Sequence, residues 1–174
     1  MVLGFNDDSG APTEPRLQLG ALPYRRRRDL EILLVTSRET RRWVLPKGWP
    51  MKRRTAQGAA AREALEEAGV KGDIAKHPFG AYHYDKRQPN GEIIPCRVDV
   101  FPLRVKRQGR TWPEAAQRTR RWFTLAEAVD AVDEPELKEL IERFGAQAAA
   151  KRAARRVAAA PSSEVAEPLA EPPR

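Results

Sequence analysis

Residues 45–70 have the sequence LPKGWPMKRRTAQGAAAREALEEAGV, and this stretch decides the fold. Its second half is typical of a short helix that begins after Thr55 as N-cap and ends at a glycine. On such a helix Glu63, Glu66 and Glu67 stand at i, i+3 and i+4 and share one face. Because like charges repel, this face costs stability unless a cation sits there, and carboxylate oxygens suit Mg²⁺ or Mn²⁺.

The alternative for these acids is a solvated helix face, which is the usual role of a few glutamates. The residues around them favour a binding site instead. Pro46, Gly48 and Pro50 predict an irregular turn before the helix. Six alanines between positions 56 and 68 would let a ligand or another backbone approach closely. A glycine-containing loop, a short helix and three carboxylates together indicate a site for a metal ion and a pyrophosphate.

The same residues carry a resemblance to a known family. The segment resembles the Nudix box, in which a glycine, five residues, a glutamate and seven residues precede Arg-Glu-apolar-any-Glu-Glu-any-Gly-apolar. Gly48 begins the pattern, and residues 62–70, REALEEAGV, end it at the family's spacing. One position departs from the pattern, because Arg54 stands where the family has its first glutamate. In the family that glutamate pairs with the box arginine, here Arg62, which Arg54 would repel.

The order of predicted elements indicates the fold class. Alternating or branched apolar runs predict strands over residues 17–24, 30–37, 43–45, 80–87, 92–106 and 118–123. Residues 71–73 are expected to form a turn, and helices are expected from residues 125 and 135, with Gly145 ending or bending the second. This order predicts an α/β domain with a mixed β-sheet between helices on both faces. The Nudix family has this α/β/α sandwich, with the box loop, helix and loop on one face.

The resemblance implies a divalent-metal site built on the box. Gly48 would offer its carbonyl oxygen to Mg²⁺ (or Mn²⁺), and Glu66 and Glu67 would be carboxylate ligands. Glu63 would be a further ligand or the base that takes a proton from the attacking water. The implied reaction is hydrolysis of a phosphoanhydride bond in a nucleoside-diphosphate-linked or polyphosphorylated substrate.

Two further residues complete the implied catalytic set. Arg62 would organise the helix by pairing with a neighbouring acid, and Glu114 is the candidate for the extra acid that family members often supply from a later loop. Arginine and lysine side chains suit phosphate groups. The candidates for the substrate phosphates are Arg25, Arg26, Arg42, Lys47 and Arg118. The alternative for residues 25–28 is the solvated tip of a hairpin.

The residues that flank the box resemble one branch of the family, which acts on diphosphoinositol polyphosphates and dinucleoside polyphosphates. The shared features are a Ser-Arg loop at residues 37–38, Arg-Trp at 42–43, and an arginine-rich approach to Trp-Phe at 118–123. The resemblance covers about residues 17–145, which we expect to form one Nudix domain. It favours a dinucleoside polyphosphate or an inositol pyrophosphate as substrate.

Composition narrows the class of partner. The chain has 174 residues, a formal net charge of +8 and a pI of about 10.1, which favours polyanions such as nucleotides, polyphosphates or nucleic acid. Cys96 is the single cysteine, so no intrachain disulfide can form, and a reducing cytoplasm is expected. No apolar run has the length of a membrane helix, and the N-terminus lacks a signal-peptide layout. We therefore expect a cytoplasmic protein without a membrane partner.

Both ends of the chain differ in composition from its middle. Residues 1–16 are rich in Gly, Pro and Asp, which predicts a flexible arm. Residues 146–174 are predicted to be a basic, alanine-rich extension followed by a disordered Pro- and Glu-rich tail. The basic part could contact nucleic acid, and its alternative is a frayed, solvated helix.

Three functions follow from these features. The first is a metal-dependent pyrophosphohydrolase that acts on a small-molecule phosphoanhydride. The second is an RNA 5′-end pyrophosphohydrolase, for which deletion of residues 146–174 should lower RNA affinity and spare small-molecule turnover. The third is a low-activity module that binds a nucleotide or polyphosphate, suggested by Arg54. The resemblance also implies a possible homodimer, because family members often form dimers, although no stretch of this sequence indicates an interface.

Overall fold

The computed structural model describes residues 14–159. The predicted flexible arm up to residue 13 and the predicted tail over 160–174 lie outside the described residues. The elements, in chain order, are β1 (Arg16–Arg26), β2 (Leu30–Thr36), β3 (Trp43–Val44), β4 (Lys47–Gly48), α1 (Ala56–Ala68), β5 (Val70–Ile74), β6 (Gly80–Arg87), β7 (Ile93–Gln108), β8 (Arg120–Thr124), α2 (Leu125–Ala131) and α3 (Pro135–Ala158).

One mixed sheet organises these elements. β1 pairs with β7 in parallel and with β2 antiparallel, and β2 also pairs with β3 and β8. β5 and β6 both pair antiparallel with β7 along its other side. The short β4 pairs with β1 so that Gly48 lies opposite Leu19. β1 is therefore the strand from which the box loop takes its position.

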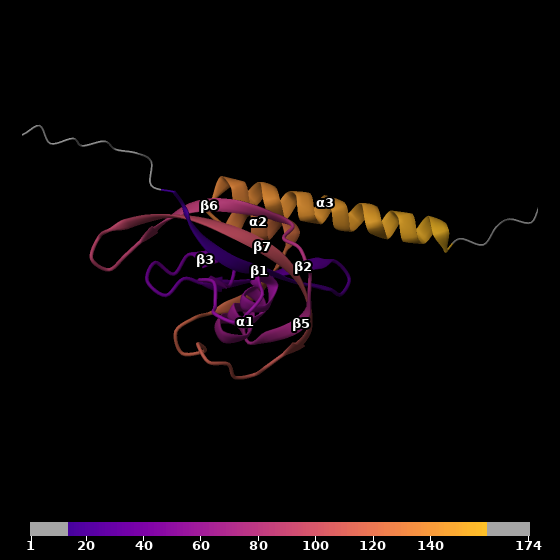
Figure 1. The fold of residues 1–174 in the computed structure, drawn as a ribbon. Coiled ribbons are helices and arrows are strands. Elements are labelled where there is room, and N and C mark those ends of the chain that lie inside the picture. The colour runs from indigo at the N-terminus through magenta and orange to yellow at the C-terminus, as the bar shows by residue number, and fades with distance from the viewer. Residues whose placement is uncertain (1–13, 160–174) are drawn as a thin grey trace, which may run out of the picture.

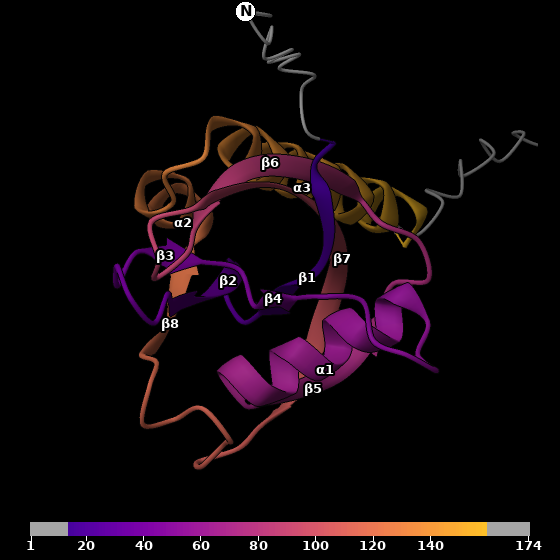
Figure 2. The ribbon, with the colours of Figure 1, turned by 60° about the vertical axis from the view of Figure 1, so that its left-hand side comes forward.

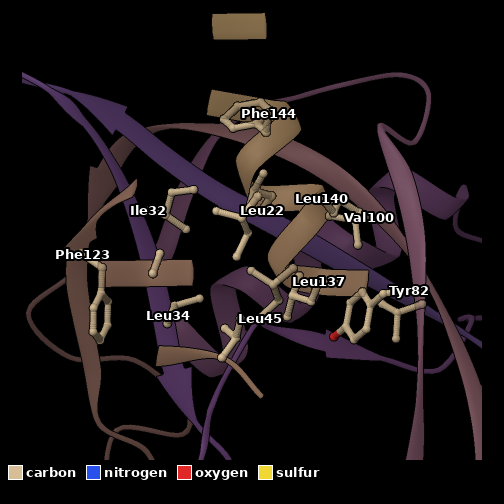
Figure 3. Packing of buried hydrophobic residues seen from close by; sticks show 14 residues of the cluster. Leu22, Ile32, Leu34, Leu45, Tyr82, Val100, Phe123, Leu137, Leu140 and Phe144 are labelled. Atoms are coloured by element: carbon tan, nitrogen blue, oxygen red, sulfur yellow. The ribbon is translucent and has the colours of Figure 1, made fainter. Parts of the chain in front are cut away.

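Helices cover both sides of the sheet, as Figures 1 and 2 show: α1 lies on one side, and α2 and α3 lie on the other. Strand alternation explains why both sides can be covered. In β2, Ile32 and Leu34 join the core beneath α2 and α3, whereas Leu33 and Val35 join the core beneath α1. Figure 3 shows Ile32 and Leu34 in the same cluster as Leu137 and Leu140 of α3, with Leu22 and Leu45 between them. The predicted α/β class with a mixed sheet between helices is confirmed.

Residues 71–73 form part of a strand rather than the predicted turn. They belong to β5, which pairs with β7 through a register shift between Lys71 and Gly72. A Cβ atom on Gly72 would lie 1.9 Å from the carbonyl oxygen of Arg104. The glycine is therefore needed for the close approach of two strands, and local sequence alone favoured the turn.

Two outcomes were predicted for Gly145, that it ends the helix or bends it. Helix α3 continues through Gly145 to Ala158, so a helix end at this position is wrong. The reason is packing between α2 and α3. Gly145 is buried, and a Cβ atom there would lie 2.2 Å from Cδ2 of Leu125. The glycine leaves room for Leu125 of α2 instead of stopping the helix. Within the described residues no helix is both long and apolar enough to cross a membrane.

Candidate active site

Helix α1 begins and ends where the sequence predicts. The Thr55 hydroxyl accepts a hydrogen bond from the Gly58 N–H at 3.2 Å, and Gly69 adopts a positive φ of 66° that suits a glycine stop. Small side chains bring the helix close to the sheet; the buried ones are Ala59, Ala60, Ala64 and Ala68. Glu63 therefore lies against the backbone of β4, and Glu67 is buried beside it.

Gly48 lies directly against the carboxylate of Glu63. A Cβ atom on Gly48 would be 2.1 Å from Oε1 and 2.9 Å from Oε2 of Glu63. Only a glycine leaves space for this carboxylate beside the β4 backbone. The pairing of β4 with β1 and the packing of α1 on the same sheet together create this contact.

A buried ion pair lies next to this contact. Arg118 donates one hydrogen bond to Glu67 and another, from Nε, to Oε2 of Glu114 at 2.5 Å. The side chains of Glu67 and Arg118 are only 8% and 7% exposed. Glu67 also accepts a hydrogen bond from the Lys47 N–H at 3.2 Å, and Arg118 donates to the Thr36 carbonyl at 3.0 Å. Arg118 thus joins the box helix to a distant loop and to the end of β2.

The loop between β7 and β8 is held by the last carbonyls of α1. The Glu114 N–H donates to the Glu66 carbonyl at 3.1 Å, and Trp112 Nε1 donates to the Glu67 carbonyl at 3.0 Å. Arg120 donates to the Ala68 carbonyl at 2.6 Å. These three bonds satisfy carbonyls that a helix end leaves free. They place Glu114 beside the box, and sequence reasoning missed the part played by Trp112 and Arg120.

Two carboxyl groups of the cluster, those of Glu63 and Glu67, have a raised pKa. Burial, followed by the charges of Glu67, Glu66 and Glu114, raises the pKa of Glu63 to about 7. Burial raises the pKa of Glu67 as well, although the neighbouring Arg118 and Lys47 act in the opposite direction. The rise at Glu63 shows that several negative groups and one half-buried carboxyl share a small volume.

Arg62 and Arg54 have different surroundings. Arg62 forms an ion pair with Glu66 one turn along α1. Arg54 is exposed, and its side chain forms no ion pair or hydrogen bond among the described residues. Within the described residues Arg62 therefore pairs inside its own helix, and Arg54 makes no ion pair to α1.

The two remaining basic candidates near the box are Lys47 and Arg42. Arg42 forms ion pairs with Asp133 and Glu134 at the start of α3. Burial lowers the pKa of Lys47, whereas the charges of Glu67 and Glu134 raise it. Lys47 therefore lies within the influence of both acids, with its Nζ 4.9 Å from the ring centre of Tyr84.

The structure does not bring Arg25 and Arg26 to this site. They stand near the end of β1, where Arg25 pairs with Glu31 and Arg26 donates to the Ala148 carbonyl of α3. Gly48 pairs with Leu19, seven residues before Arg26 on the same strand. At strand spacing this places Arg26 roughly 20 Å from the box loop.

The site's donor set suits a hard divalent cation. Four carboxylates and the Gly48 backbone converge on one end of α1, and oxygen ligands are those that Mg²⁺ and Mn²⁺ prefer. Within residues 14–159 no three His, Cys, Asp or Glu side chains are already arranged to hold a metal ion. The reason is visible in the ion pairs, since Arg62 engages Glu66 and Arg118 engages Glu67 and Glu114. Cation binding would require these carboxylates to turn from the arginines.

This arrangement defines a class of hydrolase in which a loop, a helix and an acidic cluster sit at the end of a mixed sheet. The NUDIX domain model matches residues 15–144 of the chain. The chain belongs to the Nudix family, and it is an enzyme of the Nudix pyrophosphohydrolase type.

Relatives and solved structures agree with this assignment. The chain is 34% identical over 144 residues to mitochondrial Nudix hydrolase 16 of Arabidopsis thaliana, and the match covers 74% of this chain and 79% of the relative. It is 31% identical over 128 residues to diphosphoinositol polyphosphate phosphohydrolase 3-alpha of Mus musculus, covering 71% and 74%. Its fold resembles that of the Ap4A hydrolase of C. elegans in a binary complex, with a TM-score of 0.59, 22% identity and coverage of 78% and 98%.

Proposed function

We propose that this enzyme hydrolyses a phosphoanhydride bond in a dinucleoside polyphosphate or an inositol pyrophosphate, with Mg²⁺ or Mn²⁺ as cofactor. The observation that carries the proposal is the contact of Gly48 with the Glu63 carboxylate beside the buried Glu67–Arg118 pair. Substrates with several phosphates suit the net charge of +8. The names of the mouse relative and of the nematode structure favour the same two substrate classes.

The metal would be held by Glu63, Glu66, Glu67 and the Gly48 carbonyl. When bound, it would neutralise charge on the phosphate oxygens and polarise the phosphorus that is attacked. This proposal is supported by the position of the three glutamates on one face of α1 and by the contact of Gly48 with Glu63.

The chain's own residues supply the remaining steps. Glu63 is either a further metal ligand or the proton acceptor for the attacking water; its carboxylate makes no ion pair in the described structure and lies against the loop backbone. Lys47 is the phosphate ligand nearest the box. Arg118, which is itself paired with Glu114, holds Glu67 in position, and its guanidinium is a further candidate for binding a substrate phosphate.

RNA 5′-end hydrolysis is the second candidate, since a 5′-triphosphate presents the same anhydride bonds. A low-activity binding module is the third, because Arg54 leaves the box loop without an ion pair to α1. A homodimer remains a prediction. We also propose a reducing compartment for the protein, supported by the single, buried and free Cys96.

The test is phosphate or nucleotide release with Mg²⁺ or Mn²⁺ across a panel. It holds diadenosine tetra-, penta- and hexaphosphate, an inositol pyrophosphate, ADP-ribose, nucleoside triphosphates and 5′-triphosphorylated RNA. Hydrolysis of the first four at rates well above the rest supports the proposal. Preference for the RNA selects the second candidate, and no metal-dependent turnover of any compound selects the third.

Glu67→Gln is the blank for this panel, and we expect it to lose nearly all turnover because a carboxylate ligand is removed. The structure adds a second effect. The substitution would leave Arg118 buried with Glu114 as its single carboxylate partner, so the variant should also lose roughly 1–3 kcal/mol of stability. Assays therefore run well below its melting temperature, checked by circular dichroism. Turnover at the parent rate would show that the site is misassigned.

A further inference from the structure

A second strongly charged feature lies on the opposite face of the sheet from the box. A groove of about 940 Å³ runs between the β1–β2 hairpin and the C-terminal half of α3. Arg26 of the hairpin donates to the Ala148 carbonyl of α3 at 2.8 Å, and Tyr24 packs edge-on against Phe144 with ring centres 5.0 Å apart. These contacts bring together two segments that lie more than a hundred residues apart in the sequence.

The charge of this groove has one sign. Ten of its sixteen lining residues are Arg or Lys, and none is Asp or Glu. Four of the ten are engaged elsewhere, since Arg25 pairs with Glu31, Arg104 and Lys106 pair with Asp73, and Arg26 donates to α3. Six make neither an ion pair nor a side-chain hydrogen bond among the described residues: Arg27, Arg28, Lys151, Arg152, Arg155 and Arg156.

The unpaired cations stand on both walls of the groove. Arg27 and Arg28 belong to the hairpin, and the other four lie on α3 at i, i+1, i+4 and i+5, which is one helix face. Unpaired like charges repel, so the groove costs stability unless it serves an anionic partner. The electrostatics therefore point to a polyanion that enters between two walls.

We propose that this groove binds the sugar-phosphate backbone of a single-stranded nucleic acid, without sequence preference. Two walls suit a chain better than a flat bilayer. Cations one helical turn apart, about 6 Å along α3, suit phosphates that are separated by a sugar. The phosphates of inorganic polyphosphate share bridging oxygens and lie closer together. Most of the cations are arginines, whose planar groups bind phosphate and stack on bases.

This inference goes beyond the proposed function, because the box helix α1 and the groove-lining helix α3 lie on different sides of the sheet (Figure 2). A nucleic acid bound here would approach the protein on the α3 side, roughly 20 Å from the box loop along β1. The groove therefore binds oligonucleotides that carry no phosphoanhydride at all.

The experiment uses the full chain and a twelve-nucleotide uridine oligomer with a 5′-hydroxyl and a 3′ fluorescein, followed by fluorescence anisotropy in EDTA at low salt. The groove variant is Arg27→Gln/Arg152→Gln/Arg155→Gln. Its matched control is Lys71→Gln/Lys76→Gln/Arg87→Gln, which removes three exposed cations outside the groove. Both variants have the same net charge, and equal melting temperatures would show that both are folded.

The groove variant should bind at least about tenfold more weakly. The slope of log K against log[salt] should also become less steep by about 2, since each of the three lost phosphate contacts to a single strand contributes about 0.7 to that slope. The control should stay within about threefold of the parent. Equal weakening of the two variants would overturn the proposal, because net charge alone would then explain binding.

Competition experiments distinguish nucleic-acid binding in the groove from binding at the box and from binding of other polyanions. Diadenosine tetraphosphate in EDTA should not displace the oligomer, and displacement at micromolar concentration would place binding at the box instead. Inorganic polyphosphate that competes better than unlabelled oligomer per phosphate would overturn the choice of nucleic acid. Preferential sedimentation with phosphatidylserine vesicles would do so as well. None of these outcomes depends on whether the enzyme hydrolyses the proposed substrates.

Discussion

Gly48 shows why a glycine begins the box. Its backbone dihedral does not require glycine, since the positive φ angles of glycines in the described residues occur at Gly69 and Gly91. What requires it is the Glu63 carboxylate, which occupies the space of a Cβ atom. Gly48 therefore leaves room for the Glu63 carboxylate, in addition to the role of carbonyl ligand that we propose for it.

Gly48→Ala tests this reading. The new methyl group would displace the Glu63 carboxylate, and a shift of about 1 Å at a reacting group can lower turnover on the order of a hundredfold. Unfolding free energy should change by less than about 1 kcal/mol, because the clash is with the end of a flexible side chain. Turnover of diadenosine tetraphosphate and urea unfolding measure the two effects.

Gly58→Ala is the matched control, because its Cβ atom would meet only the Thr55 hydroxyl, at 3.0 Å, at the start of the same helix. Turnover of this variant should stay within about twofold of the parent. If the Gly48→Ala enzyme turns over substrate as fast as Gly58→Ala does, the Glu63 carboxylate can move without lowering turnover.

The ends of the helices carry much of the site's organisation. The carboxyl end of α1 is closed by Trp112, Arg120 and the Glu114 N–H, and this closure brings the extra acid to the box. The amino end of α2 is closed by a capping box, in which the Glu127 carboxylate accepts from the Thr124 N–H at 2.8 Å. The second case was evident from local spacing, and the first was not.

Glu127 should give a pH-dependent contribution to stability. Hydrogen bonds from Thr124 lower the pKa of Glu127 below 4.5 in the folded state. A lowered folded pKa means that the contribution is complete above the unfolded value and is lost as pH falls through the folded one. The stability difference between parent and Glu127→Gln, from urea unfolding, should shrink on acidification from pH 7.

Glu139→Gln is the control for this series, because Glu139 is exposed and accepts no hydrogen bond in the described structure. Its stability difference from the parent should not follow that of Glu127→Gln. A difference for Glu127→Gln that stays constant across the acid range would contradict the capping role of the carboxylate.

Gly145 tests the packing of α2 on α3. An alanine there gains up to about 1 kcal/mol of helix propensity. It also places a methyl group 2.2 Å from Leu125, and overpacking costs about 1–3 kcal/mol. We therefore expect Gly145→Ala to destabilise the protein in urea unfolding. The double variant Leu125→Ala/Gly145→Ala should lose less stability than the sum of the losses in the two single variants. A Gly145→Ala protein that is more stable than the parent would show that Leu125 moves aside freely.

The sheet as a whole separates two charged surfaces. The acidic box lies at the α1 side, and the basic groove lies between the β1–β2 hairpin and α3. Because α3 runs unbroken from the core into the groove wall, deletion of residues 146–174 would cut a helix as well as remove charge. Point substitutions in the groove are therefore the cleaner test of nucleic-acid binding.

Metal binding should stabilise the whole fold. A cation that binds the native carboxylate cluster and not the unfolded chain adds about 2.7 kcal/mol at a hundredfold excess over Kd, or roughly 5–10 °C in melting temperature. Scanning calorimetry with MgCl₂ against KCl at equal ionic strength measures this shift. Glu67→Gln should show a much smaller shift, and an equal shift would place the bound cation elsewhere.

The sequence by itself determined the features that depend on nearby residues. The limits of α1, the capping box of α2, the strands other than β4 and β5, and the spacing of the box glutamates follow from local propensity and short-range pattern. That spacing was enough to identify the family. It was enough, too, to name Glu63, Glu66 and Glu67 as one acidic face.

Only the tertiary structure decided which distant groups meet. Nothing in the sequence links Arg118 with Glu67, separates Arg25 and Arg26 from the box, or places residues 151–156 beside the hairpin. Each of these depends on strand register and on how helices pack against the sheet, and both are set by contacts far apart in the chain. Gly145 is the clearest case. By local pattern it favours a helix end, yet in the structure it lies inside α3 and leaves room for the Leu125 side chain.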